Sequence, residues 1–85
     1  MAEEQRVDRF LWRARLARTR SAAQAIAREG HIRIDGRPVD RAHAPIRRGQ
    51  VLSFPLHDRV KVLKILALPK RRGPPAAARA LYEDL

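Results

Sequence analysis

The sequence predicts a small α+β domain, in which two N-terminal helices pack on a mostly antiparallel sheet of four or five short strands and a C-terminal tail helix follows. Three observations carry this prediction. Residues 6–29 repeat apolar and basic side chains with a helical period, Asp35-Gly36 marks a tight hairpin turn, and residues 51–68 contain short apolar runs. Because 85 residues allow one small domain, these elements must share a single core.

The first helix is expected to begin at Arg6. At about 100° per residue, four apolar side chains fall within one arc and form a core-facing stripe: Val7, Phe10, Leu11 and Ala14. Three arginines fall together beside this stripe as a basic ridge: Arg6, Arg9 and Arg13. Neither grouping requires the other, so their coexistence predicts a helix with one buried side and one anion-binding side.

Four other residues near this helix are given structural roles. Glu3, Glu4 and Asp8 lie near the positive end of the helix, where carboxylates interact favourably with unpaired amides. Trp12 lies at the edge of the basic ridge, and we interpret it as a core or boundary aromatic rather than a base-stacking platform.

The second helix is expected to start with Thr19 as N-cap and to end at Gly30, which can adopt the left-handed conformation after the last turn. One side of this helix is predicted to carry Ala22, Ala25, Ile26 and Glu29, with small alanines that let the two helices approach closely. The opposite side carries a polar series with a spacing of four residues: Arg20, Gln24 and Arg28.

A β-hairpin is expected directly after Gly30. Ile32 and Ile34 alternate with polar neighbours, and Asp35-Gly36 supplies the two positive φ angles that a two-residue turn needs. Since Pro38 cannot donate a hydrogen bond to a ladder, the second arm should be short or lie at a sheet edge. The side chains of Arg33 and Arg37 would then project near the turn.

The rest of the chain is divided as follows. A connection over 40–50 turns at Arg48-Gly49 into a strand over 51–54, residues 57–59 turn again, and 60–68 form a strand that is mostly buried or packed by the tail. Residues 69–75 are a basic, proline-interrupted linker, and 76–85 are expected to be helical. Lys70, Arg71 and Arg72 could contact phosphate or be solvated, and we favour solvation. The predicted division is a leader over 1–5, a domain over 6–66 and a tail over 67–85.

The charge balance favours a polyanionic partner. The formal net charge is +10, and nearly all the basic residues are arginines, which bind phosphate in a forked geometry. Residues 1–36 hold 8 basic and 5 acidic side chains, whereas residues 37–85 hold 11 and 4. Net charge alone would therefore select the second half, and it is the spatial segregation of the arginines that selects the first.

Several classes of protein are disfavoured. Without cysteine there is no disulfide framework or thiolate metal site, and no apolar run approaches the roughly 20 residues of a membrane span. His31, His43 and His57 occur in separate segments, Ser21 has no neighbouring catalytic partner in sequence, and the glycines form no phosphate loop. We therefore expect no enzyme, no metal and no cofactor, and a monomer in the cytoplasm.

Several motifs arrive in a specific order over residues 6–66. They are R-x-D-x-x-L at the first helix, T-R-S-x-A at the second, G-H-I before the hairpin, D-G at its turn, and R-R-G-Q before the next strand. In this order they resemble the RNA-binding domain named after ribosomal small-subunit protein S-four. The segments FLW and ARALYED resemble those of one bacterial branch of this family, the fifteen-kilodalton heat-shock proteins.

The resemblance implies a function and a surface. That branch binds free large ribosomal subunits that carry a nascent chain on tRNA, so ribosomal RNA, the large subunit and peptidyl-tRNA are the implied partners in stress-linked rescue. The RNA surface carried over by position coincides with the polar faces described above. It comprises Arg6, Arg9, Arg13, Thr19, Arg20, Ser21, Gln24, Arg28, His31, Arg33 and Arg37. Asp35 stands where the family often has Asn.

Three alternatives remain from the residues alone. A helix-turn-helix would bind DNA, although that motif needs its second helix free to enter the major groove and here a hairpin follows at once. A ribosome-assembly factor would use the same RNA-binding surface. A membrane-surface helix is disfavoured because the sheet needs its apolar stripe. Little aromatic area accompanies the arginines, which favours structured RNA over a single strand read base by base.

Overall fold

A computed structural model of the chain describes residues 3–28 and 30–85. Its helices are α1 (Val7–Arg13), α2 (Arg20–Arg28) and α3 (Pro75–Arg79). Its strands are β1 (Gln5–Arg6), β2 (Ile32–Ile34), β3 (Arg37–Val39), β4 (Pro45–Ile46), β5 (Val51–Leu56), β6 (Arg59–Ile65) and β7 (Tyr82–Asp84). The α+β class predicted from the sequence is confirmed.

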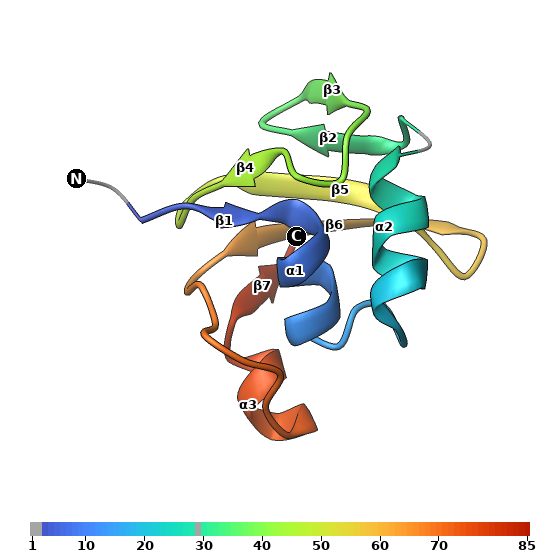
Figure 1. Cartoon of the computed structure of the whole chain (residues 1–85). Coiled ribbons are helices and arrows are strands. Elements are labelled where there is room, and N and C mark those ends of the chain that lie inside the picture. The colour runs from blue at the N-terminus through green and yellow to red at the C-terminus, as the bar shows by residue number, and fades with distance from the viewer. Residues whose placement is uncertain (1–2, 29) are drawn as a thin grey trace.

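The main sheet has five strands in the order β3-β2-β5-β6-β7, and every adjacent pair is antiparallel. A separate two-stranded ribbon pairs β1 with β4. Helices α1 and α2 lie side by side over one face of the sheet, while α3 lies beyond the end of α1 (Figure 1). This layering leaves the outward sides of α1 and α2 available for function.

The core lies between the two helices and the sheet. The stripe predicted on α1 is fully buried, with Val7, Phe10 and Leu11 at 0% exposure and Ala14 at 2%. The sheet contributes alternate residues from its strands to the same core: Ile32, Ile34, Leu52, Phe54, Leu63 and Ile65. Helices of seven and nine residues are too short to be stable alone, so their packing on this sheet holds them in place.

Two hairpins use turns with positive φ angles. Asp35 and Gly36 have φ of 52° and 82° between β2 and β3, as the sequence predicted, and His57 and Asp58 have φ of 50° and 65° between β5 and β6. Both are two-residue turns whose twist suits antiparallel strands. Strand β3, which contains Pro38, lies at the edge of the sheet, so the predicted edge position is confirmed.

The N-cap predicted for the second helix is confirmed, since the Thr19 hydroxyl oxygen accepts a hydrogen bond of 2.9 Å from the amide of Ala22. The apolar side predicted for this helix is right only in part, since Ala22 and Ile26 are partly buried and pack against the core. Ala23 and Ala27 are fully buried, whereas Ala25 is exposed, and Glu29 lies outside the described residues. The core-facing side of α2 thus contains Ala23 and Ala27, which the prediction did not include, and lacks Ala25.

The tail also differs from the prediction. Helix α3 ends at Arg79, and Tyr82, Glu83 and Asp84 pair with Ile65, Lys64 and Leu63 of β6. The helix expected over 76–85 is therefore wrong beyond its first turn. Pairing with β6 satisfies the backbone of these last residues and packs Tyr82 against the core, which outweighs their helix propensity.

The N-terminal segment contributes structure that the sequence did not reveal. Gln5 and Arg6 pair with Ile46 and Pro45, so Gln5 belongs to a strand and not to a leader, and the 40–50 connection contains β4. Two-residue strands carry too little periodicity to be recognised in a sequence. The pairing fixes the direction in which the chain enters α1.

Candidate nucleic-acid interface

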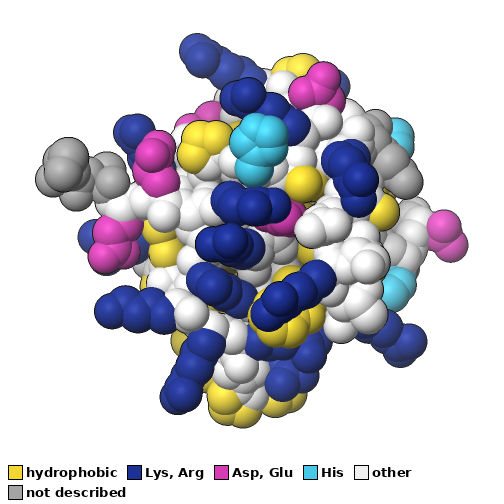
Figure 2. All heavy atoms as spheres, in the orientation of Figure 1, with side chains coloured by type: hydrophobic (Ala, Val, Ile, Leu, Met, Phe, Trp, Pro, Cys, Tyr) yellow, Lys and Arg dark blue, Asp and Glu magenta, His cyan; other side chains and the backbone are white. Residues whose placement is uncertain are grey.

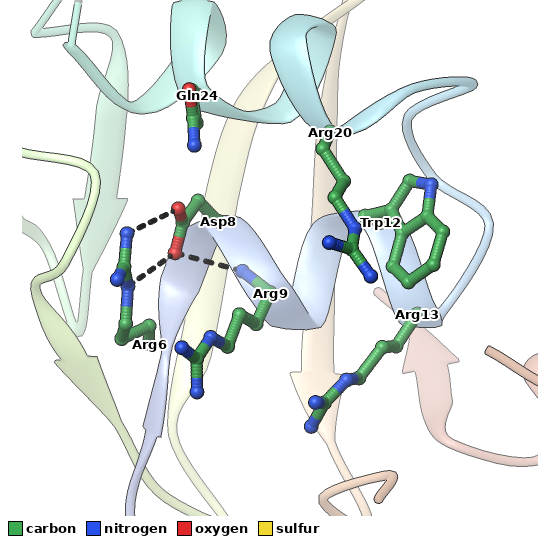
Figure 3. A pocket seen from close by; sticks show the side chains of 7 residues that line it. All are labelled: Arg6, Asp8, Arg9, Trp12, Arg13, Arg20 and Gln24. Carbon is green, nitrogen blue, oxygen red and sulfur yellow. Dashed lines mark hydrogen bonds and ion pairs between the residues drawn. The ribbon is translucent and has the colours of Figure 1, made fainter. Parts of the chain in front are cut away.

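A hollow of about 340 Å³ lies between the outward sides of α1 and α2. Its walls are formed by seven side chains: Arg6, Asp8, Arg9, Trp12, Arg13, Arg20 and Gln24. In Figure 3 the α1 arginines lie along one side of the hollow, while Arg20 and Gln24 extend from α2 toward α1. Five of these residues belong to the surface expected from the sequence.

Asp8 is the one acidic residue of the hollow, and it is 5% exposed. Its carboxylate accepts hydrogen bonds of 3.0 and 2.7 Å from the Arg6 guanidinium and one of 2.9 Å from the amide of Arg9. Asp8 therefore fixes Arg6 and caps the first turn of α1, as a carboxylate near the positive end of a helix should. The negative charge of Asp8 is neutralised by the positive charge of Arg6.

Trp12 is half-buried and lies among arginines. The guanidinium carbon of Arg20 is 4.5 Å from the centre of the indole ring, and that of Arg72 is 5.3 Å from it. Both distances fall within the range of favourable cation–π interaction. The prediction of a boundary aromatic is consistent with this position, but the two arginines beside the ring were not foreseen.

Several basic side chains lie together on this face of the molecule. Figure 2 shows Lys and Arg side chains in a row down the face on which α1 and α2 lie. Among the described residues, no ion pair to a carboxylate is found for Arg9, Arg13 or Arg20. The hollow thus holds several uncompensated guanidinium groups, an arrangement suited to a polyanion.

The start of α2 adds polar groups next to the hollow. Thr19 caps the helix, Ser21 is exposed in the first turn, and Arg28 approaches the side-chain oxygen of Gln24 at 3.5 Å, which is long for a hydrogen bond. The series Arg20, Gln24 and Arg28 lies on the outward side of α2, as predicted. It runs from the hollow toward the hairpin.

The hairpin residues do not join the hollow. Ile32 and Ile34 point into the core, so Arg33, which is exposed between them, points to the opposite face of the sheet and approaches the carbonyl of Gly36 at 3.4 Å. Arg37 lines a different hollow of about 450 Å³ beside the 40–50 connection. His31 is exposed next to the end of α2. The predicted surface is therefore divided between two sides of the molecule.

Asp35 has a structural role. Its carboxylate accepts a hydrogen bond of 2.8 Å from the amide of Val51 and lies 3.4 Å from the side-chain nitrogen of Gln50. It thus ties the β2–β3 turn to the start of β5. Nothing in the sequence spacing signalled this contact, because the two segments are far apart in the chain.

Arg72 is a candidate that the sequence left between phosphate contact and solvation, with solvation favoured. It is, however, half-buried, and its Nε donates a hydrogen bond of 3.1 Å to the carbonyl of Trp12. Only the path of the tail brings it to α1. The sequence offered one weak signal for this contact, namely a run of three cations in the tail and a single tryptophan in the first helix.

Two further properties concern the described part of the chain alone. Within residues 3–28 and 30–85, no three His, Cys, Asp or Glu side chains gather as metal ligands would. None of the helices described has the length and apolarity needed to cross a bilayer.

The S4 domain family model matches residues 5–52, which include α1, α2 and the β2–β3 hairpin. Small ribosomal subunit protein uS4 of Listeria monocytogenes is 46% identical over 50 residues, covering 59% of this chain and 25% of that protein. Its counterpart from Exiguobacterium is 38% identical over 64 residues, covering 75% and 31%. The chain thus spans about a quarter to a third of the curated relatives it matches.

A solved structure described as trimeric, heat shock protein 15 of Vibrio cholerae, is similar over almost the whole chain. The TM-score is 0.89 at 25% sequence identity, with 98% of this chain and 83% of that chain covered. The likeness extends beyond the family match to β6, α3 and β7. The monomer expected for this chain stays a prediction, since the similar protein is a trimer.

Proposed function

The chain belongs to the S4 domain family, and from this premise we propose that it binds structured ribosomal RNA through the hollow between α1 and α2. The observation that carries the proposal is the set of uncompensated guanidinium groups in the hollow. Arg9, Arg13 and Arg20 surround it, and the one carboxylate present, that of Asp8, is already bonded to Arg6. The family match covers both helices that form the hollow.

The proposed surface has a centre and a periphery. Arg6, Arg9, Arg13, Arg20 and Gln24 form the centre, and Thr19, Ser21, Arg28 and His31 extend it along α2. Arg33 would reach RNA only if the RNA also wraps around the hairpin, whereas Arg37 is the cross-strand partner of Ile34 and lies on the helix side of the sheet. Guanidinium groups and small polar groups contact phosphates and 2′-hydroxyls, so the surface suits the shape of a folded RNA more than its base sequence.

We propose the large ribosomal subunit as the particle bound, in a stress-linked rescue or recycling role that includes subunits carrying peptidyl-tRNA. The support is the likeness over nearly the whole chain to a heat shock protein, with a TM-score of 0.89. A ribosome-assembly factor is the second candidate, favoured by the identity to ribosomal protein uS4 over α1, α2 and the hairpin. The comparisons give no support to DNA binding.

The test has two stages. Filter binding to ribosomal RNA across a salt series should give a log–log slope of about −3.5 to −4.5 if about five phosphates are contacted. A salt-independent affinity would contradict the RNA proposal. Sucrose-gradient sedimentation of lysate before and after heat shock should then place the protein with free large subunits.

Other sedimentation patterns identify the alternatives. Migration with immature precursor particles at all temperatures would favour assembly, and migration with small subunits alone would contradict the large-subunit proposal. Light scattering of the purified protein, measured in parallel, decides between the expected monomer and a trimer.

A further inference from the structure

The segment Pro69–Gly73 follows α1 closely, although it forms no helix or strand. The carbonyl of Pro69 accepts hydrogen bonds from the side chains of Gln5, at 2.6 Å, and Arg13, at 3.1 Å. The carbonyl of Gly73 accepts one of 2.6 Å from Arg15. A segment held at both ends by side chains of the N-terminal region is part of the same surface.

Arg72 lies between these two anchors and points back at α1. Its Nε donates to the Trp12 carbonyl at 3.1 Å, and its guanidinium carbon is 5.3 Å from the indole centre. On the same ring, Arg20 of α2 lies at 4.5 Å. Two cations from segments about fifty residues apart are thus brought to one aromatic side chain at the end of the arginine-lined hollow.

We propose that Arg72 and Arg20, held on Trp12, form a phosphate-binding site that adds the C-terminal segment to the RNA interface. This inference rests on the proposed function, since the phosphate is that of a bound RNA strand. The proposal assigns a binding role to Arg72 and a positioning role to Trp12.

The geometry of the guanidinium group supports this assignment. Cation–π contact uses the flat face of the group, whereas its hydrogen-bond donors project from the edge, so an arginine stacked on an indole can still bind phosphate in a forked geometry. Among the described residues, no hydrogen bond is found from the Nη atoms of Arg72 or from any atom of the Arg20 guanidinium. Stacking restricts their rotamers, so less entropy is lost when phosphate binds.

A phosphate suits the site better than a base. Two guanidinium groups already occupy positions over the only indole of the chain, so a nucleobase would have to displace one of them. Neither Arg20 nor Arg72 forms an ion pair with a carboxylate among the described residues, so a phosphate supplies the opposite charge that a neutral base lacks. The surface therefore gains more from a phosphate than from a neutral ring.

The decisive experiment measures the salt dependence of binding to ribosomal RNA extracted from purified large subunits, for wild type and Arg72→Gln. Loss of one phosphate contact should weaken binding about tenfold and make the log–log slope shallower by about 0.7 to 0.9. Arg59→Gln is the matched control. It removes one exposed arginine at the start of β6, outside the hollow, and should leave the slope unchanged.

The salt slope separates a binding role from a structural one. If Arg72→Gln only loosened the tail, thermal melting would shift while the slope kept its wild-type value, and the inference would be overturned. A wild-type slope and affinity with unchanged melting would overturn it equally. If wild type itself bound no RNA, the proposed function would fail, and this outcome is distinct from failure of the Arg72 site alone.

Trp12 offers an independent measurement, because it is the only tryptophan. Two adjacent cations should concentrate iodide near the ring, so iodide should quench its fluorescence more in wild type than in Arg72→Gln, while neutral acrylamide should not distinguish them. Bound RNA should suppress the iodide effect in wild type. Iodide quenching unaffected by RNA would place the phosphate elsewhere and contradict the proposal.

Discussion

Arg6 and Asp8 are two residues apart and are joined by two hydrogen bonds, of 3.0 and 2.7 Å, between a guanidinium group and a carboxylate. Asp8 is 5% exposed, whereas the side chain of Arg6 is 40% exposed. The buried acid thus orients a cation that still reaches solvent at the hollow. An acidic residue is tolerated in a surface suited to anions because its charge is matched locally.

Replacing Asp8 with Ala should destabilise the fold by about 1.5 to 3 kcal/mol, since three hydrogen bonds to a charged group are lost while Arg6 can regain water. Asp8→Asn should cost less, because its side-chain oxygen can still accept from the amide of Arg9. Thermal unfolding followed by circular dichroism measures both. Equal costs for the two variants would show that the contact to Arg9 contributes little.

Arg9→Glu should weaken binding to ribosomal RNA at least tenfold without shifting the melting temperature. Its side chain is exposed, lines the hollow and lies outside the apolar stripe, so the reversed charge acts on the ligand alone. Arg59→Glu is the control, with the same charge change outside the hollow. A melting temperature that falls with Arg9→Glu would instead assign Arg9 a structural role.

Thr19→Ala should cost about 1 kcal/mol, because the hydroxyl that accepts from the Ala22 amide is removed from the N-cap of α2. For a domain of this size that corresponds to a lower melting temperature by about 4 to 8 °C. Ser21→Ala, an exposed hydroxyl two residues later, should melt as wild type. A similar loss in both variants would show that the effect is not specific to the cap, because alanine itself favours the helix.

Ala23→Leu should destabilise the protein by about 1 to 3 kcal/mol, because the added carbons must enter a packed space at a fully buried position. Ala25→Leu makes the same change at an exposed position of the same helix and should be nearly neutral. Denaturant unfolding of both variants compares them. The reverse ranking would favour the helix orientation originally predicted from the sequence.

The sequence was sufficient for features encoded locally. The stripe on α1, the Thr19 cap and the Asp35-Gly36 turn depend on residues within a few positions of each other, and the structure contains all three. Features that depend on distant segments were not predictable in this way. The pairing of β7 with β6 and the approach of Arg72 to Trp12 require the tail to return to the N-terminal region.

The same distinction between local and long-range features applies to the candidate site. The arginines of α1 and α2 could be grouped from helical spacing, since the basic sides of both helices border the hollow. Arg33 and Arg37 were grouped with them because the hairpin pattern placed both near the turn and the resemblance included them. Alternation along β2 directs Arg33 to the other face of the sheet. The burial of Asp8 and the hydrogen bond that Asp35 accepts from the start of β5 depend on contacts that the spacing of residues in the sequence cannot reveal.

The shortness of α1 and α2 has a consequence for fragments of the chain. Helices of seven and nine residues do not persist without β5 and β6 to cover their apolar sides. A fragment that ends before β5 would contain the arginines of α1 and α2 but not the arrangement that groups them around the hollow. The hollow is therefore a property of the whole fold and not of the two helices that line it.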